Sequence, residues 1–382
     1  MAEKEVKSLN LTKAQSQVWD HLIQIKDSNQ IGGAYLFSGP SGSGKEGLAI
    51  KFSQLLNCEN PKKNLCESCP SCQRFKQLQH ERLEIIFPMP ALKSSVKNNN
   101  DLADVSKQDL DFITQANEDK SKDLFYKIRI PKANRILIES IRQLRKKLYF
   151  KMEGEGQKMV LIFDAHLLSK GQGESANALL KILEEPPENT TLILVTDHME
   201  LLLPTIISRC QRLGVPKLDD HYIHNWFQQK MIKESDIKLL AGLSQGNIHQ
   251  AQALIKEPGD SLIKLIDGLI NVFSNNNPDQ WRKFIQTYSR LAHQDIGTFH
   301  FHFKLIQMWF RSANRLNKNV YDLLHETEFK LSMDALVQSF PNADFSSMNF
   351  ELENAIISVP KNLHMPLILT NLLIRIQKDL NR

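Results

Sequence analysis

The sequence contains no apolar run long enough to cross a lipid bilayer. Residues 1–13 are polar and of mixed charge, so they carry no hydrophobic segment of the signal-peptide kind. The excess of positive over negative charge is also small, because the sequence has 48 Lys and Arg residues and 43 Asp and Glu residues. A net charge of +5 is too small for a protein that coats DNA. We therefore expect a cytoplasmic protein with no membrane partner.

The first half of the 382-residue chain alternates short apolar runs with helical patterns. This alternation is typical of an α/β fold, in which helices cover a parallel sheet. After Pro216 the pattern is helical throughout. A chain of 382 residues is long enough for two or three domains. The predicted strands are 34–37, 159–163 and 192–195, and the predicted helices of the first half include 137–148 and 176–183.

One stretch, residues 91–122, breaks this pattern. It is rich in Asn, Asp, Lys and Ser and lacks a sustained apolar period, so we interpret it as an insertion or mobile loop. In the helical half, residues 301–316 carry four large apolar side chains on one face. That face predicts the core of a helix bundle rather than a ligand site.

A glycine-rich turn follows the first predicted strand and opens a helix. Its sequence from Gly39 to Lys45 matches the phosphate-binding loop of nucleotide-binding proteins, with Gly42 and Gly44 inside it. Glycines let backbone N–H groups turn inward around phosphate oxygens, and the helix N-terminus adds partial positive charge. Lys45 is then expected to reach the terminal phosphates. The turn predicts a nucleotide site.

The residues that hold magnesium and orient water in such sites are only partly present. The loop pattern requires Ser or Thr after the lysine as a ligand for Mg²⁺, whereas this chain has Glu46. Asp164 ends the second predicted strand and is the expected metal-site carboxylate. It is followed by Ala165, where ATP-hydrolysing proteins of this architecture have a glutamate. Binding of ATP and Mg²⁺ is compatible with the sequence, but efficient hydrolysis is not expected.

Four of the five cysteines, Cys58, Cys66, Cys69 and Cys72, lie close together, and Cys210 stands apart. In a reducing compartment such clustering favours metal ligation over disulfides. Four thiolates fill the tetrahedral positions of Zn²⁺ and leave none open for a substrate, so we predict a structural zinc site. A redox pair at Cys69 and Cys72 is the alternative, and the two further cysteines argue against it.

Three segments carry a family resemblance: AYLFSGP at 34–40, ANALLKILEEPP at 176–187 and LPTIISRCQ at 203–211. With the cysteines inserted after the phosphate-loop helix, they make the chain similar to the clamp-loader subunits of bacterial DNA polymerase III, and to delta-prime subunits most closely. The resemblance covers about residues 30–215. The remaining residues fit the family only in length and helical character.

The resemblance implies an AAA+ fold: a P-loop parallel sheet with an inserted zinc module, a small helical lid and an all-α C-terminal collar domain. The expected nucleotide-binding domain is 1–215, which includes the zinc module at 57–75 and the insertion at 91–122. The lid is expected at 216–257 and the oligomerisation domain at 258–382.

The resemblance also implies roles for three further residues. Arg209 matches an arginine finger, which reaches into a neighbouring subunit's ATP site and stabilises charge on the γ-phosphate. Thr196 matches the sensor-1 position. His249 stands at the sensor-2 position, where motor subunits have arginine, and is largely neutral at cytoplasmic pH.

These features predict a subunit that helps to load the sliding clamp on primed DNA, completes a neighbour's active site and does not hydrolyse ATP itself. Its expected partners are other clamp-loader subunits in a hetero-oligomeric ring, the sliding clamp and primed DNA. Two alternatives remain: an active ATPase motor subunit of the loader, and a zinc-dependent DNA-binding module on a vestigial ATPase body. ATP turnover by the isolated chain favours the first, and loss of DNA affinity on chelation favours the second.

Overall fold

The chain divides into two compact units in the computed structural model. The first consists of residues 1–219 with 246–249, and the second of residues 220–245 with 250–382. No helix in the described part of the chain is both long enough and apolar enough to pass through a bilayer. The structure describes residues 10–60, 65–90, 107–130, 133–149, 156–256, 259–361 and 363–382.

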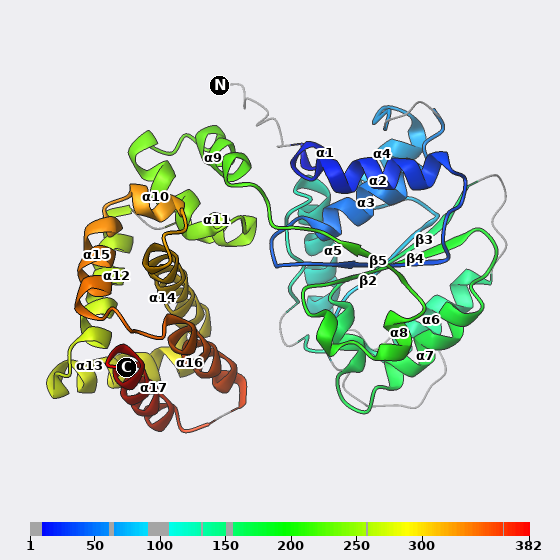
Figure 1. The fold of residues 1–382 in the computed structure, drawn as a ribbon. Helices are drawn as coiled ribbons and strands as arrows, with labels where there is room; N and C mark the ends of the chain where they lie inside the picture. The colour runs from blue at the N-terminus through cyan, green and yellow to red at the C-terminus, as the bar shows by residue number, and fades with distance from the viewer. Residues whose placement is uncertain are drawn as a thin grey trace. The chain divides into compact units, whose positions relative to one another are not determined.

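A five-stranded parallel sheet forms the centre of the first unit, with the strand order β2-β3-β4-β1-β5 (Figure 1). The inner strands are almost wholly apolar because helices bury them on both faces. Phe37 lies beside Val195 in the register of β1 and β4, so the carboxyl ends of these strands meet at one edge. The strands are β1 (Ala34–Ser38), β2 (Leu83–Ile86), β3 (Lys158–Ile162), β4 (Thr190–Thr196) and β5 (Gln211–Gly214).

Helices α1 to α4 lie on one face of this sheet and α6 to α8 on the other, while α5 lies at one end (Figure 1). Successive residues of a strand point to opposite faces of the sheet and so supply an apolar core on each face. On one face the Tyr35 ring packs edge-on against Phe52 of α3. On the other face Leu36 packs with Ile141 and Leu144 of α6. The helices are α1 (Leu11–Ala14), α2 (Ser16–Asp27), α3 (Lys45–Leu56), α4 (Pro70–Lys76), α5 (Lys107–Lys122), α6 (Ile138–Leu148), α7 (Glu174–Glu184) and α8 (Pro204–Ile207), with short 3₁₀ helices η1 (Ala165–Ser169) and η2 (Met199–Leu201).

The second unit is helical throughout its described residues. Helix α14 buries Phe303, Ile306, Trp309 and Phe310, which confirms the predicted apolar face. The helices are α9 (Asp220–Gln229), α10 (Glu234–Ser244), α11 (Ile248–Leu254, whose first two residues group with the first unit), α12 (Gly259–Ser274), α13 (Pro278–Gln294), α14 (Ile296–Asn317), α15 (Phe329–Ser339), α16 (Phe345–Ser358) and α17 (Met365–Leu380), with 3₁₀ helices η3 (Leu323–Glu326) and η4 (Val359–Lys361).

The three predicted strands are confirmed as β1, β3 and β4. The interpretation of residues 91–122 as an insertion or mobile loop is wrong only in expecting a loop over 107–122. Residues 91–106 lie outside the described residues, whereas 107–122 form helix α5. The helix escaped prediction because its inward side carries Ala116 and a buried lysine, Lys120, in place of an apolar stripe. The Lys120 ammonium donates to Glu46 at the start of α3, and this contact attaches α5 to α3.

Candidate functional site

The predicted phosphate-binding loop, Gly39–Lys45, joins β1 to α3 at the carboxyl edge of the sheet. Gly42 and Gly44 have φ values of +72° and +86°, which glycine adopts without a steric penalty. A Cβ atom at Gly42 would overlap the Asn247 side chain, and one at Gly44 would lie 2.5 Å from Leu11 Cδ1. The loop glycines are therefore enclosed by other segments of the first unit.

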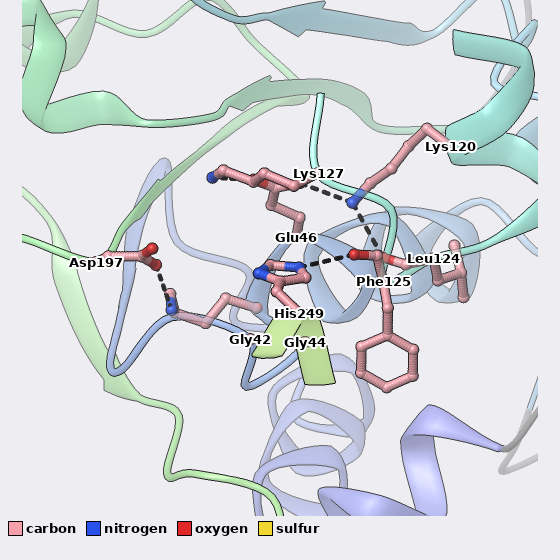
Figure 2. A pocket seen from close by; sticks show the side chains of 10 residues that line it. Gly42, Gly44, Glu46, Lys120, Leu124, Phe125, Lys127, Asp197 and His249 are labelled. Atoms are coloured by element: carbon pink, nitrogen blue, oxygen red, sulfur yellow. Dashed lines mark hydrogen bonds and ion pairs between the residues drawn. The ribbon is translucent and has the colours of Figure 1, made fainter. Parts of the chain in front are cut away.

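The Lys45 side chain is turned back onto its own loop. Figure 2 shows its ion-pair partner Asp197 beside the other labelled residues of the pocket. The Lys45 Nζ atom donates to the carbonyl oxygens of Gly39, at 2.9 Å, and Pro40, at 2.6 Å. The same atom forms an ion pair with Asp197 Oδ1 at 2.6 Å. Burial lowers the pKa of Lys45, and the Asp197 carboxylate opposes this shift. The Lys45 ammonium, which was expected to reach phosphate, is thus bonded to acceptors of the chain itself.

Glu46 lies between two lysines that sequence reasoning did not select. Its Oε2 atom accepts from Lys120 Nζ at 2.6 Å, and its Oε1 atom accepts from Lys127 Nζ at 2.6 Å. Burial raises the pKa of Glu46, but the two ammonium groups outweigh burial and hold the pKa at about 2. The Glu46 side chain is only 10% exposed, so its charge is balanced by neighbouring side chains more than by water.

Lys127 also contacts Asp164, with Nζ 2.7 Å from Oδ1. Asp164 follows β3 with a left-handed backbone, φ 50° and ψ 44°, a conformation that aspartate tolerates better than most residues. Burial lowers the pKa of Lys127, and the carboxylates of Glu46 and Asp164 reverse this and raise it above its ordinary value. The members of this ionic cluster are Lys45, Glu46, Lys120, Lys127, Asp164 and Asp197.

The ionic cluster is electrically neutral and leaves little empty space beside its side chains. Three ammonium groups face three carboxylates, which is the condition under which buried charges are tolerated. The cavity that remains beside the cluster has a volume of about 20 Å³ and is lined also by Phe125 and His249. The space enclosed among these side chains has room for about one water molecule.

Acid is expected to weaken the fold through Glu46. The pKa of Glu46 falls from 4.5 to about 2 on folding, so its stabilising contribution is complete above pH 4.5 and is lost as the pH falls toward 2. This difference in pKa corresponds to on the order of 3 kcal/mol. Urea unfolding at neutral pH and near pH 3 measures it: Glu46→Gln should be less stable at neutral pH and should lose less stability in acid. The exposed control Glu118→Gln should behave as the native chain, and an unchanged acid loss in Glu46→Gln would contradict the expectation.

His249 contacts the segment that carries Lys127. Its Nε2 atom lies 2.8 Å from the carbonyl oxygen of Phe125, which can only accept, so Nε2 carries the proton. Its Nδ1 atom lies 3.5 Å from the Ser41 hydroxyl. Burial lowers the pKa of His249, and the bond to Phe125 only partly opposes the shift, so the ring is neutral at pH 7. The side chain at the expected sensor-2 position therefore brings no positive charge.

Thr196 and Arg209 make their contacts outside the ionic cluster. The Thr196 hydroxyl lies 3.1 Å from His166 Nδ1 and accepts from the backbone N–H of His198 at 3.0 Å. Arg209 follows α8, and its guanidinium donates to Glu184 Oε1 at 2.7 Å and to the carbonyl of Thr205 at 2.9 Å. Its side chain is 35% exposed.

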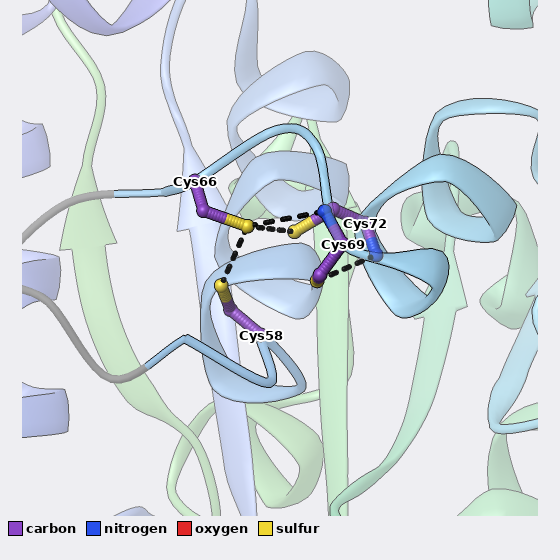
Figure 3. A group of neighbouring side chains, drawn as sticks. All are labelled: Cys58, Cys66, Cys69 and Cys72. Carbon is purple, nitrogen blue, oxygen red and sulfur yellow. Dashed lines mark hydrogen bonds between the residues drawn. The ribbon is translucent and has the colours of Figure 1, made fainter.

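The four clustered cysteines meet at one point (Figure 3). Their sulfur atoms all lie within 4.8 Å of one another, with Cys58 and Cys66 at 3.4 Å and Cys66 and Cys72 at 3.7 Å. Four sulfurs at zinc–sulfur bond length around one tetrahedral ion are about 3.8 Å apart. The group could therefore hold Zn²⁺. Backbone N–H groups of Cys69 and Ser68 lower the pKa of Cys66 to about 5, which favours the thiolate that a metal requires.

Sequence reasoning missed Lys120, Lys127 and Asp197. Asp197 directly follows β4, so its place at the carboxyl edge was available as a signal. Lys120 lay within the segment interpreted as a loop, and Lys127 is separated from Glu46 by 81 positions. No local pattern marks either lysine as a partner of Glu46.

The parallel sheet with helices on both faces, together with the helical second unit, defines an α/β protein with a C-terminal helical domain. The family described as DNA polymerase III, delta subunit, matches residues 14–219, which is more than half of the chain. The chain belongs to this family, and the resemblance to clamp-loader subunits is confirmed.

Similar proteins include the DNA polymerase III subunit delta' of Bacillus subtilis (strain 168), 25% identical over 366 residues that cover 93% of this chain and 92% of that protein. Subunit tau of the same organism is 28% identical over 260 residues, which cover 65% of this chain and only 37% of tau. A crystal structure of a gamma subunit-related protein from Thermotoga maritima aligns with 94% of this chain and 99% of its own, at 17% identity and a TM-score of 0.39.

Proposed function

We propose that this chain is a delta-prime-like subunit of the DNA polymerase III clamp loader, which helps to place the sliding clamp on primed DNA. The similarity to a delta' subunit over 93% of this chain and 92% of that protein supports this assignment over a tau-like one, where the match covers 37% of the relative. In this role the chain acts beside other loader subunits in a cytoplasmic ring.

The observation that carries the proposal is the contrast between the ionic cluster and Arg209. The groups that would bind phosphate and metal, Lys45, Glu46 and Asp164, are engaged with side chains and carbonyls of the chain itself. Arg209 is instead held near the surface by Glu184. A subunit with these features contributes to catalysis through a neighbour's site, where Arg209 stabilises charge on the transferred phosphate.

The ion pair between Arg209 and Glu184 suits such a role. Both side chains are partly exposed, and exposed pairs of this kind contribute about 0–1 kcal/mol. A triphosphate carries more negative charge than one carboxylate and accepts two parallel guanidinium bonds. Transfer of the guanidinium from Glu184 to phosphate is therefore favourable once a neighbouring subunit presents a nucleotide.

We assign the remaining parts by the same resemblance. Residues 1–215 form the AAA+ domain. Gly39, Gly42, Gly44 and Thr196 stand at the positions that contact nucleotide in the family that the chain resembles. The zinc module at 57–75 is structural because its four ligands leave no open position. The helices of 216–257 correspond to the lid and those of 258–382 to the collar.

ATP turnover by the purified chain, alone and mixed with gamma- or tau-type subunits, tests the function. The isolated chain should show no turnover above background, because the ionic cluster occupies its nucleotide site, and the mixture should form a stable hetero-oligomer on size exclusion. Turnover by the chain alone that Lys45→Ala abolishes would favour the motor subunit instead. Failure to enter a loader assembly would contradict the clamp-loader role.

A further inference from the structure

Lys127 lies between the two side chains that occupy the metal-binding positions of a phosphate-loop site. Its Nζ atom is 2.6 Å from Glu46 Oε1 and 2.7 Å from Asp164 Oδ1. In nucleotide-hydrolysing proteins of this architecture, the residue after the loop lysine and the carboxylate after the strand hold Mg²⁺. We propose that Lys127 is a built-in cation that replaces the divalent metal of this site, and that residues 120–127 permanently close the loop against nucleotide.

Charge balance supports the replacement. The Lys127 ammonium contacts both carboxylates, as a metal ion would, but it comes as part of the chain and needs no free Mg²⁺. With Lys120 on the other oxygen of Glu46, the local charges already sum to zero. A divalent ion entering beside Lys127 would add two positive charges that the carboxylates Glu46 and Asp164, already paired, do not balance, so metal binding requires that the Lys127 ammonium leave.

The residue at position 46 is explained by the same arrangement. A Ser or Thr hydroxyl, as the loop pattern requires, is neutral and short. Glu46 instead supplies one oxygen to each of Lys120 and Lys127, whose side chains are 1% and 17% exposed, so the first is fully buried and the second is partly buried. Without this carboxylate both charges would lose a partner in a poorly solvated place. The glutamate is therefore matched to internal lysines and not to a metal.

The segment that carries these lysines also closes the loop sterically. Lys120 Nζ has three acceptors, Glu46 and the carbonyls of Leu124 and Tyr126, so its three protons are all engaged. A Cβ atom at Gly44 would lie 3.0 Å from the Phe125 ring, which places that ring against the loop. A triphosphate would have to expel Asp197 from Lys45 and approach three carboxylates, with room for about one water molecule.

Binding of Mn²⁺, followed by electron paramagnetic resonance on the zinc-loaded full chain, tests the proposal. The native chain should bind no Mn²⁺ at this site, whereas Lys127→Met removes the ammonium and should create one oxygen-ligated site per chain. The double variant Lys127→Met with Asp164→Asn should lose that site. Lys127→Arg, which keeps the charge, and Lys122→Met, on an exposed lysine of α5, should bind no more Mn²⁺ than the native chain.

Two results would overturn the proposal: Mn²⁺ binding by the native chain that Asp164→Asn removes, or a folded Lys127→Met variant with no gain in Mn²⁺ binding. If Lys127→Met does not fold, a measurement on the native chain still tests the proposal. Its melting temperature should not change with millimolar Mg²⁺ and ATP, and a rise would refute closure of the loop. Failure of these tests would remove the contrast between the ionic cluster and Arg209, but it would leave in place the membership in the clamp-loader family, which rests on the match over residues 14–219.

Discussion

Replacing Arg209 with alanine is expected to slow ATP hydrolysis at the neighbouring subunit's site on the order of 10³-fold in a loader reconstituted with this chain. The physical reason is that, in the role proposed for this chain, the Arg209 guanidinium stabilises the charge that develops on another subunit's γ-phosphate. Its present partner, Glu184, is an exposed carboxylate that a triphosphate can replace. The chain itself should fold normally, because the ion pair contributes little to its stability.

Single-turnover hydrolysis and the rate of clamp loading measure this effect, with binding of ATP to the assembled loader measured separately. Arg209→Lys should recover only a small part of the rate, since an ammonium cannot form two parallel bonds to phosphate. Arg142→Ala is the control, because Arg142 is an arginine of α6 that is 66% exposed and forms an ion pair with Glu139, three positions earlier in the same helix. A loader with Arg209→Ala that hydrolyses ATP at the native rate would refute the assignment.

Loss of one clustered cysteine is expected to abolish zinc binding and to unfold the module at 57–75. The native chain should contain one zinc ion, because four sulfur atoms lie within 4.8 Å of one another. Structural zinc contributes about 10 kcal/mol or more to the folding of small zinc modules, and three remaining thiolates bind far more weakly than four. Cys72→Ser should therefore leave less than a tenth of the native zinc content.

Zinc content by atomic absorption and the melting temperature after dialysis against a chelator measure this effect. Cys210→Ser is a suitable control, since Cys210 is equally a buried cysteine but lies outside the cluster. It should keep one zinc ion and an intact module. Full zinc content in Cys72→Ser would show that the four sulfurs do not bind the metal together.

The parts of this protein that could be predicted from sequence are those fixed by local chemistry. A positive φ at Gly42 and Gly44 requires glycine, so the loop is visible in the sequence. The spacing of the cysteines likewise implies a common metal. The inner strands are predicted by their apolar runs, whereas β5 was missed because it is a short, largely exposed edge strand without such a run.

The state of the nucleotide site could not be predicted in this way. It depends on contacts between residues far apart in sequence, such as Lys127 with Glu46, 81 positions away, and Lys120 with Glu46, 74 positions away. Lysines are common on protein surfaces, so neither the buried Lys120 nor the partly buried Lys127 is marked by a sequence pattern of its own. The motif showed that a standard ligand was missing at position 46, but only the fold shows which groups take its place.

The cysteine cluster has a further consequence for the protein outside a reducing environment. Two of its sulfur atoms, those of Cys58 and Cys66, lie only 3.4 Å apart. Once the metal leaves, a sulfur oxidised to the sulfenic acid has a second thiol within reach and condenses with it to a disulfide, with loss of water. Air would thus convert the metal-free chain into a cross-linked form that accepts zinc again only after a reductant has restored the thiols.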